Sequence, residues 1–148
     1  MFATRLRISV VDDEEAMRKA LSRLFDSAGF EVKTYASGCE FLDSLEQNRP
    51  DCVVLDLHMP ELSGLEVHAR VGQENPKLPV IFMTGLDEPG LRERLTSAGA
   101  AAYLKKPFDE RELLEAIATA TFKNTAQEKT KGGIAGKLVG DTSITLTT

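Results

Sequence analysis

Short apolar runs alternate with amphipathic segments along most of the chain, and each pattern predicts a different element. The stronger runs are apolar at nearly every position instead of every second one, which is typical of parallel strands buried on both faces. On this basis five strands are predicted, the second and the last from weaker patterns: residues 6–11, 31–35, 52–57, 80–84 and 101–104.

A helical pattern follows each of these runs. Ser-x-x-Glu spacing at 37–40 and at 63–66 is that of a capping box, which satisfies backbone N–H groups at a helix start. Gly29 and Gly99 stand where glycine commonly ends a helix. The five predicted helices are residues 15–28, two helices that begin near Ser37 and Ser63, residues 91–98, and a helix that begins near Asp109.

Five strand–helix units in succession predict the fold class. Parallel strands joined by right-handed helical crossovers form a doubly wound α/β sheet. In such sheets ligands bind at the carboxyl ends of the strands, near a switch in strand order. The residues that end the predicted strands are therefore the candidates for a functional site.

Composition and charge narrow the class of protein. The 148 residues are 42% hydrophobic and 28% charged, as in an ordinary globular domain. No apolar run approaches the roughly 18 residues that span a membrane, and the first residues lack the apolar stretch of a secretory signal. We therefore expect a cytoplasmic protein without a membrane partner. The net charge of −5 argues against direct nucleic-acid binding by this chain, and the two cysteines, without a CxxC pair, are expected to stay reduced.

Residues 123–148 differ from the rest of the chain. They are rich in glycine and threonine, carry four lysines against two acids, and show no helical face. The segment is too short for a domain of its own. A flexible tail, a linker to an effector and a remnant of cloning are the three interpretations. The predicted domain therefore comprises residues 1–122.

Polar residues stand at the predicted strand ends. Asp12 and Asp13 follow the first strand, Asp56 ends the third, Thr84 ends the fourth, and Lys106 follows the fifth. If these strands are neighbours, three carboxylates converge, which is unfavourable unless a cation lies among them. Hard oxygen ligands suit Mg²⁺, with Mn²⁺ as the alternative. We expect Asp13 to bind the ion directly and Asp12 to bind it directly or through water.

One carboxylate is then free to act as a nucleophile. Carboxylates form aspartyl phosphates, and a metal ion that bridges the attacking and phosphoryl oxygens suits an in-line displacement. Thr84 and Lys106 are placed to bind the remaining phosphoryl oxygens and to offset their charge. The strand ends therefore predict phosphoryl transfer that depends on a metal ion.

Four stretches resemble a known family in their order and spacing. VVDDEEA, LDLHMPELSGLE, PVIFMTG and AGAAAYLKKPF, all within about residues 5–122, resemble the receiver domain of bacterial two-component response regulators. PELSGLE and VIFMTG are further similar to FixJ-type receivers that precede LuxR-type DNA-binding domains. The resemblance implies a flavodoxin-like five-stranded parallel sheet of order 2-1-3-4-5 with five helices.

The resemblance also implies a role for each residue of the metal site. Asp56 matches the phosphoacceptor, which also contacts the metal ion. Asp12 and Asp13 match the acid pair that binds Mg²⁺. The backbone carbonyl of His58, two residues after Asp56, matches the third protein ligand. On this resemblance the chain is a phosphoacceptor that assists its own phosphorylation and dephosphorylation, and not an enzyme acting on other substrates.

Further roles follow for the later strand ends. Thr84 matches the switch hydroxyl and Lys106 the lysine that pairs with the phosphate, followed by a peptide bond to Pro107 that is typically cis. Tyr103 matches the aromatic residue that changes rotamer. Leu86, two residues after Thr84, is apolar and cannot orient an attacking water, so a long-lived phosphorylated form is expected. The side chain of His58 lies at another variable position, where it could tune dephosphorylation.

The implied mechanism is a two-state switch. A histidine kinase or a phosphotransfer protein donates the phosphoryl group to Asp56, and Thr84 with the loop 85–90 moves inward. Tyr103 then turns, and the face made by helix four, strand five and helix five changes. The output implied is a homodimer through that face or docking of a partner, with any contact to nucleic acid made by an output domain outside this chain.

Three other functions compete with this one. An aspartyl-phosphate hydrolase would need a second acid two residues after the nucleophile, where His58 stands. A flavodoxin-like nucleotide binder would need a glycine- or hydroxyl-rich loop after the first strand, whereas residues 12–16 read DDEEA. A docking module that works without phosphorylation would have lost an acid or the lysine, and this chain keeps them.

Overall fold

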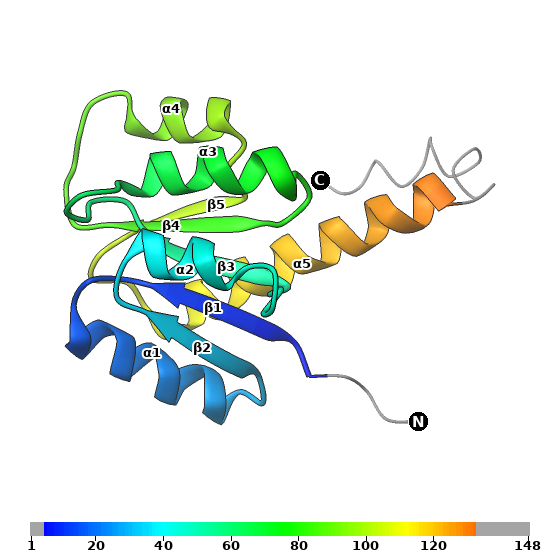
Figure 1. The fold of residues 1–148 in the computed structure, drawn as a ribbon, viewed down its shortest axis with the longest axis horizontal. Coiled ribbons are helices and arrows are strands. Elements are labelled where there is room, and N and C mark those ends of the chain that lie inside the picture. The colour runs from blue at the N-terminus through cyan, green and yellow to red at the C-terminus, as the bar shows by residue number, and fades with distance from the viewer. Residues whose placement is uncertain (1–4, 133–148) are drawn as a thin grey trace.

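The structure, a computed structural model, describes residues 5–132, and for residues 124–132 only the backbone. Within this part, five strands and five helices alternate along the chain (Figure 1). In chain order they are β1 (Arg7–Val11), α1 (Glu15–Ser27), β2 (Glu31–Tyr35), α2 (Gly38–Ser44), β3 (Cys52–Asp56), α3 (Gly64–Glu74), β4 (Val80–Thr84), α4 (Leu91–Ala98), β5 (Ala102–Lys105) and α5 (Glu110–Gly132).

The strands form one parallel sheet in the order β2-β1-β3-β4-β5. This arrangement confirms the predicted doubly wound fold and its strand order. In the register of the sheet, Asp56 of β3 lies beside Met83 of β4, and Thr84 lies beside Lys105 of β5. Because the strands are parallel, the carboxyl ends of β1, β3, β4 and β5 share one edge of the sheet.

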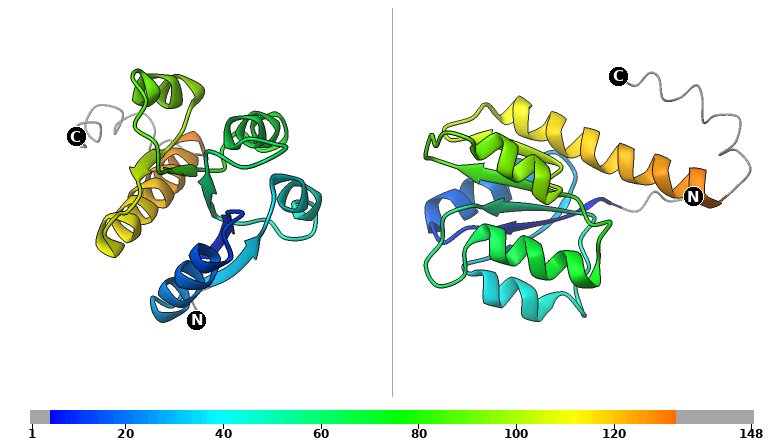
Figure 2. Two further views of the ribbon diagram at one scale, coloured as in Figure 1. Left: turned by 90° about the vertical axis from the view of Figure 1, so that its left-hand side faces the viewer. Right: turned by 90° about the horizontal axis from the view of Figure 1, so that it is seen from above.

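Helices cover both faces of the sheet (Figure 2). The face under α1 and α5 buries residues such as Phe25 and Ile117, and the opposite face, under α2, α3 and α4, buries Phe41 and Phe82. Strands β3 and β4 lie in the middle of the sheet and are buried at every position. The edge strands β2 and β5 are only partly buried, which explains why their apolar patterns are weaker.

Local sequence signals are mostly confirmed at the helix ends. Ser63 and Glu66 form both hydrogen bonds of a capping box at α3. At α2, Ser37 accepts from the Glu40 N–H, but the Glu40 carboxylate accepts from the N–H of the residue before Ser37, so only half of the predicted box is present. Gly99 ends α4 with a positive φ of 95°, a conformation that glycine adopts without strain.

Helix α5 extends beyond the predicted domain end at residue 122. The sequence from 123 shows no helical face, yet the helix continues to Gly132. Residues 123–131 include lysine, glutamine, alanine and glutamate and contain no proline or glycine, so extending the existing helix through them costs little free energy. The domain boundary at 122 stays a prediction, and what was expected of residues 133–148 concerns residues outside the described part.

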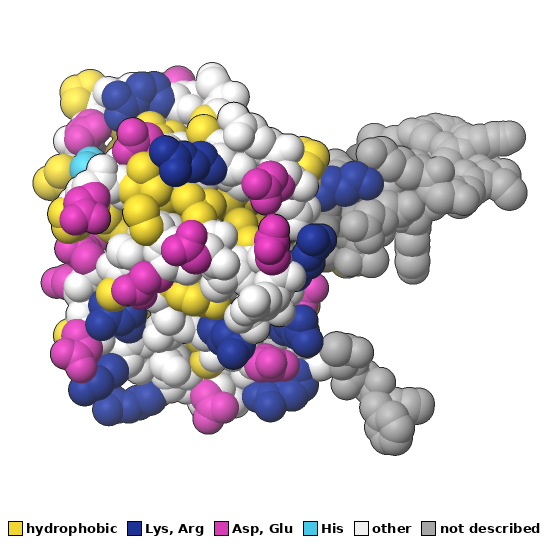
Figure 3. All heavy atoms as spheres, in the orientation of Figure 1, with side chains coloured by type: hydrophobic (Ala, Val, Ile, Leu, Met, Phe, Trp, Pro, Cys, Tyr) yellow, Lys and Arg dark blue, Asp and Glu magenta, His cyan; other side chains and the backbone are white. Residues whose placement is uncertain are grey.

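The surface carries charges of both signs. Acidic and basic side chains are interspersed over the face formed by α2, α3 and α4 (Figure 3). Among the helices of residues 5–132, none combines the length and the apolar character needed to cross a membrane.

Candidate functional site

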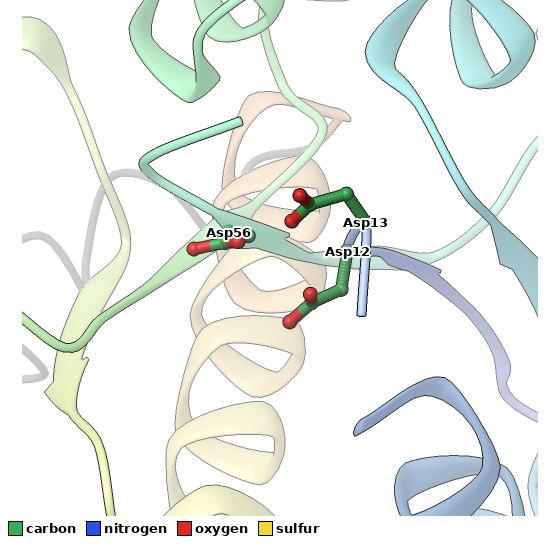
Figure 4. A group of neighbouring side chains, drawn as sticks. All are labelled: Asp12, Asp13 and Asp56. Atoms are coloured by element: carbon green, nitrogen blue, oxygen red, sulfur yellow. The ribbon is translucent and has the colours of Figure 1, made fainter. Parts of the chain in front are cut away.

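Three carboxylates meet at the edge of the sheet where the strands end (Figure 4). Asp12 and Asp13 follow β1, and Asp56 is the last residue of β3. One carboxylate oxygen of each lies within 4.8 Å of the others. Asp12 and Asp56 are buried, with 0% and 6% of their surface exposed, whereas Asp13 is exposed. The structure therefore brings together the three acids that the sequence singles out.

Backbone contacts hold Asp12 in place as the chain leaves the sheet. Its N–H donates to the carbonyl of Tyr35 at 3.1 Å, which continues the pairing of β1 with β2. Its Oδ1 accepts from the N–H of Glu14 at 2.9 Å, so the chain turns toward α1. The Arg18 Nη1 donates to the Asp12 carbonyl at 2.9 Å. The other carboxylate oxygen, Oδ2, faces the site.

Lys106 is the cation among these acids. Its Nζ lies 3.1 Å from Asp12 Oδ2, 3.7 Å from Asp56 Oδ1 and 3.9 Å from Glu14 Oε1. The Lys106 N–H donates to the Thr84 carbonyl at 2.7 Å, and the peptide bond to Pro107 is cis, as the resemblance implies. Burial by itself lowers the pKa of Lys106, but the attractions to Asp12, Asp56 and Glu14 together outweigh it and raise that pKa, so the ammonium stays charged.

The environment of Asp56 disfavours its ionised form. Burial, followed by repulsion from Asp12, raises the pKa of Asp56 to about 6, although Lys106 and the His58 N–H act in the opposite direction. One lysine does not offset three carboxylates, so the site favours an additional cation. The donors are all hard oxygens, which fits Mg²⁺ or Mn²⁺.

Thr84 lies on the other side of the site, at the end of β4. The residue is completely buried, and its Oγ1 accepts from the Leu86 N–H at 3.1 Å. The same Oγ1 lies 3.4 Å from His58 Nδ1 and 3.4 Å from the Leu86 carbonyl oxygen. Leu86 itself is 52% exposed. The Thr84 hydroxyl therefore contacts both His58, which follows β3, and the loop between β4 and α4.

Tyr103 lies on β5, two residues before Lys105. It is half-buried and packs against the hydrophobic cluster under α2, α3 and α4. In the sheet it pairs with Phe82 of β4, two residues before Thr84. The structure thus places Tyr103 and Thr84 on adjacent strands, offset by two residues in the register.

Four further charged residues of the site could not be identified from the sequence. Glu14 contacts Lys106 and Arg18 contacts Asp12, while Glu88 contacts His58 and Arg94. Each is a charged residue on a helix or in a loop, of a kind found on any protein surface, and only the fold shows which residue it contacts.

Gly64 is different, because its place at a helix start is visible in the sequence. A Cβ on Gly64 would lie 2.5 Å from the Asp56 carbonyl oxygen, so glycine permits the close approach of α3 to β3.

Comparison with known sequences identifies the family. Residues 8–118 match the profile of the response regulator receiver domain. Nodulation protein W of Bradyrhizobium diazoefficiens is 35% identical over 133 residues, which cover 90% of this chain and 59% of that protein. The response regulator protein TmoT of Ectopseudomonas mendocina is 38% identical over 122 residues, which cover 82% of this chain and 55% of that protein. The chain therefore spans little more than half the length of these curated relatives.

Solved structures show the same fold. A CheY-like response regulator receiver domain protein from Methanospirillum hungatei superposes with a TM-score of 0.79 at 27% identity, over 84% of this chain and 99% of that one. The structure described as FixJ-N superposes with a TM-score of 0.73 at 33% identity, over 80% of this chain and 95% of that one. Fold, strand-end acids and sequence profile agree, and the chain belongs to the response regulator receiver domains of two-component systems.

Proposed function

We propose that this chain is a phosphorylation-dependent switch, in which a histidine kinase or a phosphotransfer protein transfers a phosphoryl group to Asp56. The observation that carries the proposal is the environment of Asp56. This carboxylate is nearly buried at a strand end, beside two further acids and 3.7 Å from the Lys106 ammonium. Its family membership supports a two-component role, with a histidine kinase as the phosphoryl donor.

The residues that would hold the metal ion are the carboxylates of Asp12, Asp13 and Asp56 together with the backbone carbonyl of His58. The clustered acids support this assignment because they carry more negative charge than Lys106 offsets. When bound, Mg²⁺ or Mn²⁺ would neutralise charge on the phosphoryl oxygens and so favour in-line transfer.

In the transfer, an Asp56 carboxylate oxygen attacks the phosphorus atom. A P–O bond forms as the P–N bond of the donor phosphohistidine breaks, and the departing imidazole nitrogen keeps the electron pair. With a pKa of about 6, most Asp56 carboxyls are ionised at neutral pH and can act as the nucleophile. Lys106 and the Thr84 hydroxyl would each bind a phosphoryl oxygen, and these contacts stabilise the charge that the transfer places on Asp56.

The proposed response begins at Thr84 and spreads along β4 and β5. When the Thr84 hydroxyl turns to the phosphoryl group, the loop after β4 follows and Tyr103 changes rotamer. The surface of α4, β5 and α5 then changes, and it would form a homodimer or bind a partner or an output domain. The greater length of the relatives supports an output domain as the partner of this surface, and any contact with nucleic acid would be made through such a domain.

The first experiment is incubation with acetyl phosphate and Mg²⁺, followed by measurement of the intact mass. A single added phosphoryl group is expected in the unaltered protein, and none in Asp56→Asn or in the presence of EDTA. Asp43→Asn, which removes an exposed carboxylate on α2, is the matched control and should be modified like the unaltered protein. A folded protein that gains no mass would refute the proposal and favour docking without phosphorylation.

A further inference from the structure

A series of side-chain contacts connects Thr84 with helix α4. The Thr84 Oγ1 lies 3.4 Å from His58 Nδ1, and the other ring nitrogen, Nε2, lies 3.4 Å from Glu88 Oε2. The second carboxylate oxygen of Glu88 lies 3.0 Å from Arg94 Nη2. Glu88 belongs to the loop after β4 and Arg94 to α4, so the series leads from the proposed switch hydroxyl to the proposed output face.

The Glu88 carboxylate sets the proton positions on the His58 ring. A carboxylate accepts hydrogen bonds, so Nε2 carries the hydrogen that faces Glu88. In the neutral imidazole Nδ1 is then the acceptor, and the Thr84 hydroxyl is the donor. The acceptor sites of the same hydroxyl face the Leu86 N–H, which donates at 3.1 Å. The Thr84 proton thus has two acceptors at the same distance of 3.4 Å, His58 Nδ1 and the Leu86 carbonyl oxygen.

A phosphoryl group on Asp56 needs this same proton. Phosphoryl oxygens accept hydrogen bonds and donate none when ionised, so Thr84 can bind one only through its single O–H. That hydrogen bond cannot form while the O–H is directed at His58. His58 and the phosphoryl group are therefore competitors for one donor, the hydroxyl of a fully buried residue.

From this competition we infer that His58 is a positioning residue for the switch: its imidazole, oriented by Glu88, holds the Thr84 hydroxyl away from Asp56. The inference rests on the proposed function, since it concerns the cost of phosphorylating Asp56. Loss of the His58 contact makes the phosphorylated conformation easier to reach. Arg94 orients Glu88 and thereby lets the position of α4 influence how firmly Thr84 is held.

The expected effect is modest, for two reasons. Both contacts of His58 are 3.4 Å long, near the upper limit for hydrogen bonds. The side chains of Glu88 and Arg94 are 36% and 57% exposed, so their ion pair adds little stability and acts by orientation. A weak hydrogen bond lost from one of two states shifts their equilibrium by about two- to fivefold.

The test is a titration with beryllofluoride, a phosphoryl mimic, in the presence of Mg²⁺, followed through the backbone amide resonances. His58→Phe keeps the bulk of the ring and removes both nitrogens, so its midpoint should fall about two- to fivefold. His58→Gln keeps an acceptor for Thr84 and a donor for Glu88, and its midpoint should stay near that of the unaltered protein. A lower midpoint in His58→Phe but not in His58→Gln would show that loss of the hydrogen bond to Thr84 causes the change. Easier entry of beryllofluoride to Asp56 would not depend on the hydrogen-bonding groups of the side chain.

Two surface variants test the role of Glu88. Glu88→Ala should lower the midpoint in the same direction as His58→Phe, and the double variant should show no more than the larger single effect, because both changes break one series of contacts. Glu93→Ala removes a neighbouring exposed acid of α4 and is the control that should leave the midpoint unchanged. An unchanged or raised midpoint in His58→Phe overturns the inference, and an unchanged midpoint in Glu88→Ala overturns the role of Glu88.

The titration also separates this inference from the proposed function. If beryllofluoride changes neither the unaltered protein nor Asp56→Asn, phosphoryl binding at Asp56 is refuted. If it changes the unaltered protein but not Asp56→Asn, and the His58 and Glu88 variants titrate like the unaltered protein, only the positioning role is refuted.

Discussion

Removing the charge of Asp56 should stabilise the protein in the absence of a metal ion. Asp56→Asn keeps the shape of the side chain but cannot ionise. In the unaltered protein the folded state must carry a buried carboxylate next to Asp12, whereas the unfolded chain exposes the same carboxylate to water. We expect the free energy of unfolding in EDTA to be higher for Asp56→Asn at neutral pH.

The raised pKa gives the size and the pH range of this gain. The pKa of Asp56 rises from 3.8 to about 6, and each unit corresponds to about 1.4 kcal/mol, so the gain is on the order of 2–3 kcal/mol. Because the folded state holds the proton more tightly, protonation of Asp56 stabilises the folded state. This contribution to the free energy of unfolding is fully present below about pH 4. It is lost as the pH rises toward 6. The gain from Asp56→Asn should therefore be near zero at pH 4 and complete above about pH 7.

Urea denaturation followed by circular dichroism between pH 4 and pH 8, in EDTA, measures this difference. Asp43→Asn removes an exposed charge from α2 and should show no comparable gain at any pH. Addition of Mg²⁺ should stabilise the unaltered protein more than Asp56→Asn and reduce the difference between them. An equal difference at pH 4.5 and pH 7.5, or a less stable Asp56→Asn at pH 7.5, would refute the reasoning.

Three further predictions concern neighbouring residues. Lys106→Met should lower the free energy of unfolding by about 2–4 kcal/mol in urea denaturation, because the buried Asp12 carboxylate loses its partner at 3.1 Å. Gly64→Ala should cost about 1–3 kcal/mol by the same measurement, since its Cβ would lie 2.5 Å from the Asp56 carbonyl oxygen. The phosphorylated protein should persist well beyond seconds by intact mass, and Leu86→Asn should shorten its lifetime by supplying a group that orients water. An unchanged stability in either of the first two variants, or loss of the phosphoryl group within seconds, contradicts the corresponding prediction.

Much of the fold could be predicted because its signals are local. The central strands β3 and β4 are buried on both faces, so they had to be apolar throughout, and this pattern is visible without the structure. Ser63 and Gly99 mark a helix start and a helix end through interactions within a few residues. The acids of the site could be predicted for a related reason, because parallel strands place their carboxyl ends together whatever the details of packing.

Other features depend on residues that are distant in the sequence. Glu40 bonds one residue earlier than the capping pattern predicts, and α5 continues past residue 122 although the segment has no apolar face. Neither outcome follows from hydrophobic spacing. A small shift of the Glu40 side chain changes which N–H it accepts from, and the low cost of extending an existing helix allows α5 to continue.

By itself, the sequence determined the succession of strands and helices along the chain and which acids stand at the strand ends, since both depend on spacing along the chain. Only the tertiary structure decided that Lys106 contacts Asp12 across most of the chain, that Asp56 is buried deeply enough to raise its pKa to about 6, and that His58 connects Thr84 with Glu88. The physical reason is that burial, repulsion between charges and competition for a hydrogen bond depend on distances in space, which are set when the strands and helices pack together.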